Sequence, residues 1–186
     1  LNQPKPIVGD GAMRTMLHQR GVGFDVCFDQ LNLTQPALVA EIHREYIEAG
    51  AQIIQTNTFG ANRYKLARHG LEDKLVQINT AGVELARRVV LASFKEVYIA
   101  GDVGPLGVRL APFGRVQPEQ ARQAFVEQIS ALAQAGVDLL MLETMTDLFE
   151  VHEAVQAARQ AAPALPVLAS MTFTRDDRTL LGDDPT

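Results

Sequence analysis

Polar side chains that could do chemistry recur where short apolar runs of this sequence end. Asp10 follows "PIVG", Asp102 follows "YIAG" and Glu143 ends "DLLMLE". The other ends carry hydroxyl or amide groups, at Thr56, Asn57, Thr144 and Thr172. Carboxylates at such positions can exchange protons with a substrate, so the series is a candidate for acid–base or binding chemistry. A polar residue after a strand is also often a helix cap, but five ends in series are hard to explain by capping alone.

The runs that carry these residues alternate with longer amphipathic stretches. Val, Ile and Leu dominate the runs, which is typical of parallel strands buried on both faces. We expect five strands, at residues 6–10, 51–58, 97–104, 137–144 and 165–173. Helical patterns lie between them, near residues 35–49, 73–93, 118–135 and 147–161. No linker or low-complexity tract divides the chain, so we expect one domain over residues 1–186 with no internal boundary.

The alternation of strand and helix predicts a parallel sheet with right-handed crossovers. This leaves two architectures, an open doubly wound sheet and a (β/α)8 TIM barrel. In a barrel all strand ends converge on one mouth, whereas an open sheet uses only the crevice at its switch point. Because a polar group ends every run, the sequence favours the barrel.

The length of the chain fits only part of such a barrel. A complete barrel takes about 250 residues, and the five units already account for all 186 residues. The closing stretch "TRDDRTLLGDDPT" resembles a loop entering a helix, with Thr186 where a sixth unit is still to come. We expect that the other units belong to further polypeptide or are supplied by other material, because an open barrel leaves two unpaired strand edges.

Composition narrows the class of function. The chain is 47% hydrophobic and 21% charged with a formal net charge of -5, which is typical of a globular protein and unlike a nucleic-acid surface rich in Lys and Arg. No run approaches about 18 apolar residues and the start lacks a secretion-signal pattern, so we expect a cytoplasmic protein without a membrane partner. Cys27 is the single cysteine and cannot form an internal disulfide framework.

Five motifs carry a resemblance to a known family. They are "GDGAMRTML", "CFDQLNLTQPALV", "QTNTFGANRYKLARHGLED", "GDVGPLG" and "DLLMLETMTDL". In this order and spacing they resemble the strand-end motifs of the homocysteine S-methyltransferase domain. That domain occurs in cobalamin-dependent methionine synthases, in bacterial fusions with methylenetetrahydrofolate reductase and in betaine-dependent relatives. The wording of the third motif is most similar to the first two branches.

The resemblance implies a (β/α)8 barrel that binds homocysteine and zinc and transfers a methyl group to the sulfur, giving methionine. It places Asp10 and Glu143 around the substrate ammonium, and the backbone N–H groups of Gly11 and Ala12 near the substrate carboxylate. Zinc would deprotonate a thiol that otherwise titrates near about 8.5. The other positions carried over as substrate-binding are Thr56, Asn57, Phe59, as an apolar wall, and Asp102. No residue is assigned a catalytic role.

The zinc ligands that the resemblance implies are three cysteines after the sixth and eighth strands, beyond Thr186. Cys27 lies in the first loop and matches none of them, and we interpret it as a partly buried loop residue. His18, His43, His69 and His152 are scattered and do not form a metal-binding pattern. The implied methyl donor is methylcobalamin or methyltetrahydrofolate. The implied partners are the remaining half of the barrel and cobalamin, folate or reductase modules, and this fragment alone is expected to be inactive.

Two features leave alternatives open. Arg14 stands where the family usually has glycine, and it either reaches toward an anionic group or points to solvent from a first helical turn; a positive φ there would strain the site. The function could instead be that of another barrel enzyme using paired carboxylates, which would raise the pKa of Asp10 or Glu143. A third alternative is an inert half-barrel that acts as an interaction element.

Overall fold

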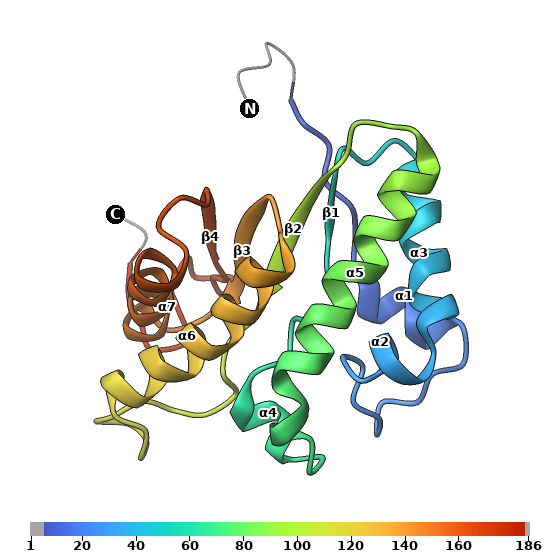
Figure 1. Ribbon diagram of the computed structural model, residues 1–186. Coiled ribbons are helices and arrows are strands. Elements are labelled where there is room, and N and C mark those ends of the chain that lie inside the picture. The colour runs from blue at the N-terminus through green and yellow to red at the C-terminus, as the bar shows by residue number, and fades with distance from the viewer. Residues whose placement is uncertain (1–5, 185–186) are drawn as a thin grey trace.

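A parallel four-stranded sheet lies at the centre of the computed structural model, which describes residues 6–184 (Figure 1). Its strands are β1 (Ile53–Gln55), β2 (Tyr98–Val103), β3 (Leu139–Met145) and β4 (Val167–Met171). They pair in chain order, β1-β2-β3-β4, and every pair is parallel. This confirms the α/β class and the strand order of a barrel. Thr186, where we expected the next unit to be still to come, lies outside the described residues.

The first expected strand, residues 6–10, pairs with the sheet but forms only one bridge. Gly9 bridges Ile53 in parallel, and the Asp10 backbone N–H donates to the Ile53 carbonyl at 2.9 Å. Pro6 and Gly9 explain the short pairing, since proline has no N–H and glycine weakens a strand. Figure 1 shows this segment, in blue, running beside β1. The expectation of a full strand here is wrong, but the segment still delivers Asp10 to the edge of β1.

Helices connect the strands, and the four long ones agree with the sequence patterns. They are α3 (Pro36–Glu48), α5 (Leu75–Ser93), α6 (Pro118–Ala135) and α7 (Leu148–Ala161). The short elements α1 (Met13–Gln19), α2 (Leu31–Thr34), α4 (Arg63–Ala67) and the 3-10 turn η1 (Glu72–Lys74) complete the set. Within residues 6–184 no helix is long and apolar enough to cross a membrane.

The start and end of α6 show how local sequence sets these boundaries. Pro118 opens the helix, and the Gln117 and Gln120 side chains cap each other's backbone N–H groups. Gly136 ends the helix with φ of 92°, a conformation that glycine adopts without strain. Asp147 caps α7 by accepting from the Phe149 N–H at 2.8 Å. These caps hold α6 and α7 in register with the strands on either side.

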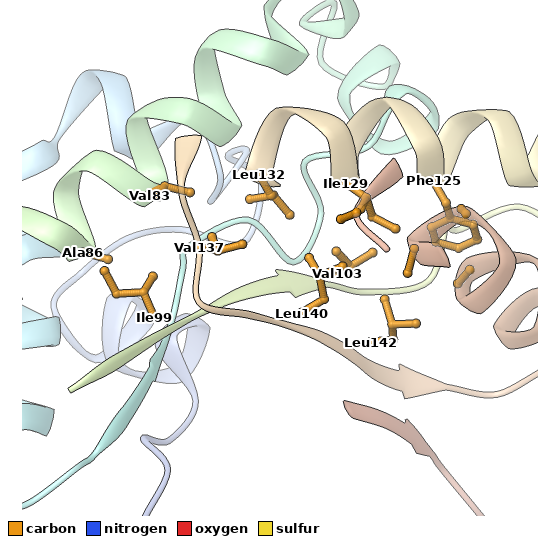
Figure 2. Packing of buried hydrophobic residues seen from close by; sticks show 14 of the residues in the cluster. Val83, Ala86, Ile99, Val103, Phe125, Ile129, Leu132, Val137, Leu140 and Leu142 are labelled. Atoms are coloured by element: carbon orange, nitrogen blue, oxygen red, sulfur yellow. The ribbon is translucent and has the colours of Figure 1, made fainter. Parts of the chain in front are cut away.

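The main core lies between the sheet and the long helices (Figure 2). Alternate residues of β2 and β3 point toward the helices, including Ile99, Val103, Leu140 and Leu142. They meet the apolar face of α6, which contributes Phe125, Ile129 and Leu132. A smaller cluster, which includes Ile53, Ala100 and Leu139, lies on the opposite face of the sheet. Burial of apolar surface on both faces is what a parallel sheet with covering helices requires.

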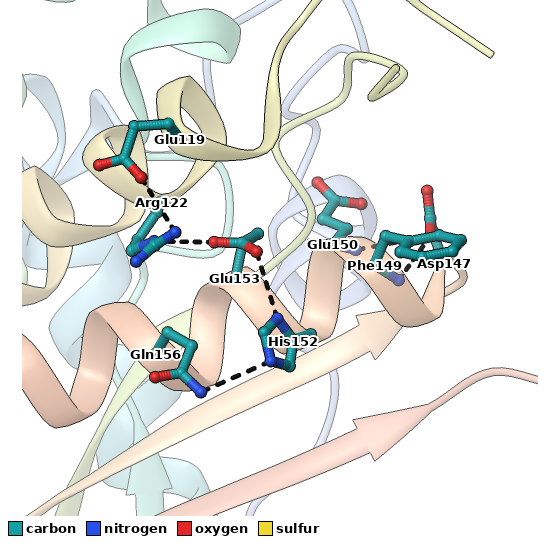
Figure 3. Close-up of polar contacts among 8 residues, drawn as sticks. All are labelled: Glu119, Arg122, Asp147, Phe149, Glu150, His152, Glu153 and Gln156. Atoms are coloured by element: carbon teal, nitrogen blue, oxygen red, sulfur yellow. Dashed lines mark hydrogen bonds and ion pairs between the residues drawn. The ribbon is translucent and has the colours of Figure 1, made fainter. Parts of the chain in front are cut away.

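Helices α6 and α7 are also joined by charged groups (Figure 3). The Arg122 guanidinium lies 2.8 Å from Glu153 of α7 and 2.9 Å from Glu119 of its own helix. Glu153 is nearly buried, so its pairing with Arg122 prevents an uncompensated charge at the contact between the helices. Glu150, on the same helix, accepts a hydrogen bond from the Leu106 N–H at 2.7 Å. Helix α7 therefore also holds the loop that follows β2.

The last strand differs from the expectation of burial on both faces. Leu168 of β4 is 46% exposed, and the three central residues of this strand are all exposed. Its outer edge pairs with no other strand of residues 6–184. β4 is therefore an edge strand in this structure, as expected of a partial barrel with unpaired edges.

Replacing Leu140 with Ala should lower the free energy of unfolding by about 2–5 kcal/mol, because Leu140 is fully buried in the middle of the sheet. Leu91→Ala is the matched control, since Leu91 is 70% exposed on α5, and its effect should stay within about 0.5 kcal/mol. Urea unfolding of both variants measures the difference. Similar losses in the two variants would contradict the placement of the core.

Candidate functional site

A cleft of about 380 Å³ opens where the parallel strands end. Its lining includes six of the eight positions expected to bind substrate: Ala12, Thr56, Asn57, Phe59, Asp102 and Glu143. The other two, Asp10 and Gly11, come just before Ala12 in the chain, and Asp10 is tied to β1 beside the cleft. The barrel interpretation predicted this convergence, since the carboxyl ends of neighbouring parallel strands meet at one edge.

Asp10 is held by Gln55, the last residue of β1. The Gln55 backbone N–H donates to Asp10 Oδ2 at 2.8 Å, and the Gln55 side-chain Nε2 lies 3.4 Å from Oδ1. Burial raises the pKa of Asp10 to about 6, against these hydrogen bonds, and the nearby charge of Glu143 raises it further. Asp10 is therefore a partly buried carboxyl group whose charge is costly unless a cation is bound beside it.

Glu143 occupies an irregularity in the sheet. The pairing of β3 with β4 shifts register between Leu142 and Met145, and Thr144 has a φ of 59°. Such a φ is strained for a β-branched residue, and a bulge of this kind redirects the neighbouring side chain. Burial raises the pKa of Glu143, and a hydrogen bond from the Gln55 side chain opposes the rise. Gln55 thus links Asp10 and Glu143 from two different parts of the chain.

Asp102 is the most buried carboxyl group of the cleft. Its side chain is 6% exposed, and Oδ1 has no hydrogen-bond partner among the described residues. Burial raises its pKa well above the ordinary value, and the charges of Glu143, Asp29 and Asp10 add to the rise. Charge on Asp102 is therefore costly in this cleft unless a cation lies nearby.

The loop after β1 is buried, and side chains from other elements satisfy much of its backbone. Asn32 Nδ2 donates to the Asn57 carbonyl at 2.8 Å, and Gln128 Nε2 donates to the Thr58 carbonyl at 2.7 Å. Asp29 Oδ1 accepts from the Gly60 N–H at 2.8 Å. Because these groups come from three different elements, the loop has one conformation that satisfies all of them.

The two amide and hydroxyl residues expected to bind substrate are part of this packing. Asn57 Nδ2 donates to the Phe28 carbonyl at 2.8 Å and lies 3.1 Å from Asn32 Oδ1. Thr56 Oγ1 accepts from the Asp102 N–H at 3.1 Å and lies 2.7 Å from Thr58 Oγ1. Both side chains are buried. Asn57 Nδ2 and the Thr56 hydroxyl already have protein partners, so these two side chains position the cleft wall.

Two positions of the site require glycine because neighbouring rings are packed closely against them. A Cβ at Gly11 would lie 2.9 Å from the Tyr46 hydroxyl, and one at Gly104 would lie 2.4 Å from Phe59 Cε2. Larger side chains at either position would displace the Tyr46 or Phe59 ring. Phe59 is therefore held against Gly104 at the wall of the cleft, where it presents apolar surface.

Arg14 lies on the first turn of α1, where the φ is negative and the backbone is helical. The strain that a positive φ would cause is therefore absent at this residue. Its side chain is exposed and lines the cleft, with the guanidinium carbon 4.6 Å from the centroid of the Phe28 ring. It neither points freely to solvent nor pairs with an anion, and instead covers an aromatic ring.

The described residues contain no metal site. Within residues 6–184 no three His, Cys, Asp or Glu side chains are grouped so that they could hold a metal ion. Cys27 is buried and lines the cleft, and its Sγ lies 3.9 Å from Asp29 Oδ2. Burial raises the pKa of the Cys27 thiol, so it is held as a thiol. A zinc ion does not fit the donor groups of this part of the chain.

The four histidines lie in different environments. His18 Nδ1 lies 3.0 Å from the Val22 carbonyl oxygen, and His152 Nδ1 lies 3.2 Å from Glu153. His69 lines the cleft, whereas His43 is fully buried in α3 with no partner on either ring nitrogen. Burial lowers the pKa of His43 to about 4, which keeps it neutral.

Comparison with known proteins decides the family. The sequence model of the family described as "Homocysteine S-methyltransferase" matches residues 7–186. The chain belongs to this family. It is 33% identical over 191 residues to a methionine synthase of Mycobacterium leprae and 34% identical to that of Mycobacterium tuberculosis. Each match covers 96% of this chain but only 16% of the mycobacterial protein, so the chain spans about a sixth of these relatives.

Solved structures place the fold of this homocysteine S-methyltransferase family member. The metallated form of the homocysteine methyltransferase MmuM from Escherichia coli superposes with a TM-score of 0.85 at 26% sequence identity. That match covers 97% of this chain and 68% of the other. The apo form of the same protein superposes with a TM-score of 0.74 over 96% of this chain. The four strands and their helices thus correspond to part of a (β/α)8 barrel.

Three residues of the site were missed by sequence reasoning. Gln55 follows two isoleucines of β1. Side chains of a strand point to its two faces in turn, which was a signal that Gln55 faces away from the helices. Asp29 lies in the quoted motif "CFDQLNLTQPALV" but after no strand, and Lys65 lies in "RYKLARHG" as an ordinary helical lysine. Both line the cleft only because α2 and α4 fold over it, and nothing in the sequence pattern predicted those short helices.

The raised pKa values of Asp10 and Glu143 also agree with the alternative of a carboxylate acid–base enzyme. Burial without a bound cation raises both pKa values whatever the reaction, so the shift does not separate the alternatives. Membership of the homocysteine S-methyltransferase family supports methylation of homocysteine in general.

Asp10 should make the protein less stable as the pH rises from about 4 to above 6. Its pKa is about 6 in the folded state against 3.8 ordinarily, so its contribution is complete below pH 3.8 and is lost through pH 6. The Asp10→Asn variant lacks this titration. The difference in unfolding free energy between variant and wild type should therefore shift in favour of the variant by roughly 1–3 kcal/mol from pH 3.5 to pH 7. Urea unfolding at the two pH values measures this; a difference that does not change with pH would contradict the shift.

Proposed function

We propose that this chain is the N-terminal part of a barrel that binds homocysteine and passes a methyl group to its sulfur, giving methionine. The observation that carries the proposal is the pair of partly buried carboxylates, Asp10 and Glu143, joined by Gln55 in a member of the homocysteine S-methyltransferase family. Residues 1–186 form one unit in this proposal, and other polypeptide supplies the remaining barrel.

The ammonium group of homocysteine suits the carboxylate pair. An ammonium has three N–H donors and no acceptor, and each carboxylate can take one charge-assisted hydrogen bond from it. The buried Gln55 Oε1 has no partner among the described residues and could accept the third. The cation would offset the cost of burying the two carboxylates, so their pKa values should fall when homocysteine binds.

The rest of the amino acid would lie along the first turn and the cleft wall. We propose that backbone N–H groups of Gly11 and Ala12 meet the substrate carboxylate, at the place where Tyr46 packs closely against Gly11. Phe59 would contact the methylene groups. Thr56 and Asn57 would hold the wall, and the buried Asp102 would line the cleft with Glu143.

The sulfur must be deprotonated before it can attack a methyl group, because the thiolate is the nucleophile. In this proposal zinc supplies that activation, and its ligands come from outside residues 1–186, since the described residues contain no such group. The methyl donor, methylcobalamin or methyltetrahydrofolate, would be presented by other modules. The mycobacterial relatives, about six times the length of the matched segment, have room for such modules.

Replacing Glu143 with Gln should weaken homocysteine binding about tenfold to a hundredfold. The change keeps the shape of the side chain but removes one charge-assisted hydrogen bond, which contributes on the order of 1.5–3 kcal/mol. Propanethiol lacks the ammonium, so its affinity should change less than about threefold. Titration of both thiols into wild type and variant, in the full-length protein that contains this chain, measures the difference.

Glu119→Gln is the matched control, because Glu119 lies on the exposed start of α6 and does not line the cleft. Both thiols should bind this variant as they bind wild type. Equal losses for homocysteine and propanethiol in Glu143→Gln would show that Glu143 supports the fold and would exclude it as the ammonium partner.

Cys27→Ser should leave the zinc content of the full-length protein unchanged. Cys27 is the single cysteine of the chain and belongs to no group of three or more His, Cys, Asp or Glu side chains that could hold a metal ion among the described residues. Metal analysis of the purified variant gives the zinc content per polypeptide. A loss of one zinc per polypeptide would mean that this thiol is a ligand and that the metal site is misplaced.

A further inference from the structure

Two cations cover the aromatic rings that line the cleft. The Arg14 guanidinium carbon lies 4.6 Å from the centroid of the Phe28 ring, and Lys65 Nζ lies 4.3 Å from that of Phe59. Arg14 comes from α1 and Lys65 from α4, on two sides of the cleft, and both line it. We call these two side chains the cationic rim. A cation over an aromatic face takes the place that another cation would occupy there.

No acidic side chain pairs with the rim. Neither Arg14 nor Lys65 has a carboxylate within 4 Å among the described residues. Asp29 attracts both from a greater distance, and Glu150 attracts Lys65. Both carboxyl groups are buried, where Asp29 accepts the Gly60 N–H and Glu150 accepts the Leu106 N–H. Asp102 is likewise buried with a raised pKa. The Asp10–Glu143 pair is taken up by the substrate ammonium in the proposed function. The charges that lie over the two aromatic rings are therefore positive and have no close acidic partner among the described residues.

This charge matters for the methyl donor. In the transfer, the sulfur lone pair of the thiolate forms the new S–CH3 bond while the bond between methyl and donor breaks, and its electron pair leaves with the donor fragment. A cationic donor, such as a sulfonium or a quaternary ammonium, leaves as a neutral fragment. An uncharged or anionic donor leaves with one more negative charge. The two classes of donor therefore require opposite charge around the cleft.

We propose that Arg14 and Lys65 set the donor class of this protein, excluding cationic methyl donors and favouring donors that leave with negative charge. The inference rests on the proposed function, since it assumes that homocysteine occupies the same cleft. Sulfonium and quaternary ammonium groups bind best over open aromatic faces. Phe28 and Phe59 do not offer such faces here, because the rim covers each ring on one side and Phe59 also packs against Gly104.

Two small probes test the charge preference in the full-length protein saturated with homocysteine. Trimethylsulfonium stands for a cationic donor, and methyl phosphate, a dianion, stands for a donor that leaves with negative charge. Calorimetric titration should show that wild type binds methyl phosphate at least about tenfold more tightly than trimethylsulfonium. This comparison uses the wild-type protein alone. Tighter binding of trimethylsulfonium than of methyl phosphate would overturn the inference.

The double variant Arg14→Gln with Lys65→Gln should weaken methyl phosphate about tenfold and tighten trimethylsulfonium by a similar factor. Arg14→Lys with Lys65→Arg keeps both charges and should retain the wild-type order. Arg88→Gln with Lys74→Gln, two exposed residues outside the cleft, makes the same change of net charge and should alter neither affinity more than about twofold. Unchanged affinities in Arg14→Gln with Lys65→Gln would overturn the assignment. Changes of equal size in Arg88→Gln with Lys74→Gln would also overturn it.

Homocysteine titration into wild type is done first and separates the two proposals. If homocysteine does not bind, the proposed function fails. If homocysteine binds as proposed but the rim variants leave both probes unaffected, only the inference about the donor fails.

Discussion

The structure depends on satisfying the backbone of one buried loop, the segment from Thr56 to Asn62 that follows β1. Buried carbonyl and N–H groups without partners are costly, and only the start of this segment bonds to the neighbouring strand, through the Thr56 N–H and the Ala100 carbonyl of β2. Asn32, Gln128 and Asn79 donate to its carbonyls at Asn57, Thr58 and Ala61. Asp29 accepts from Gly60, and the Gly104 N–H donates to Phe59. The polar side chains of α2, α5 and α6 are therefore buried for a structural reason, and together they fix the wall of the cleft.

The rigid loop lets the carboxyl groups lie close together without a bound cation. The Asp10 carboxyl group is held by Gln55 immediately before the loop, and the Asp102 backbone N–H donates to the Thr56 hydroxyl within the loop. Glu143 is directed into the cleft by the irregular pairing of β3, with Thr144 in a strained conformation. Burial raises the pKa values of all three, which is a cost that a bound ammonium would offset. Strain and desolvation of this kind are typical of a preformed binding site.

Periodicity and strand-end chemistry predicted the parallel sheet, the four long helices and the convergence of Asp10, Asp102 and Glu143. They succeeded because burial on the helix side imposes alternation on β2 and β3, and because parallel strands must end at the same edge. Periodicity did not predict the short helices, because α2 and α4 are too short to show a helical period. Sequence patterns also could not show that Asn57 would be used up by the Phe28 carbonyl, or that Arg14 would cover the Phe28 ring, since both follow from the loop that α2 anchors. The weak pairing at residues 6–10 was missed because the apolar run was given more weight than Pro6 and Gly9, which limit strand pairing. The exposed edge at β4 agrees with the unpaired edges expected of a partial barrel.

The central claim is that the ends of β1 and β3, with the segment before α1, hold the ammonium group of homocysteine. A crystal structure of the full-length protein with homocysteine bound tests it most directly. We predict that the substrate nitrogen lies within about 3.2 Å of carboxylate oxygens of both Asp10 and Glu143, with the sulfur directed away from this pair. A substrate nitrogen that contacts neither carboxylate, or homocysteine bound outside the cleft, would contradict the account.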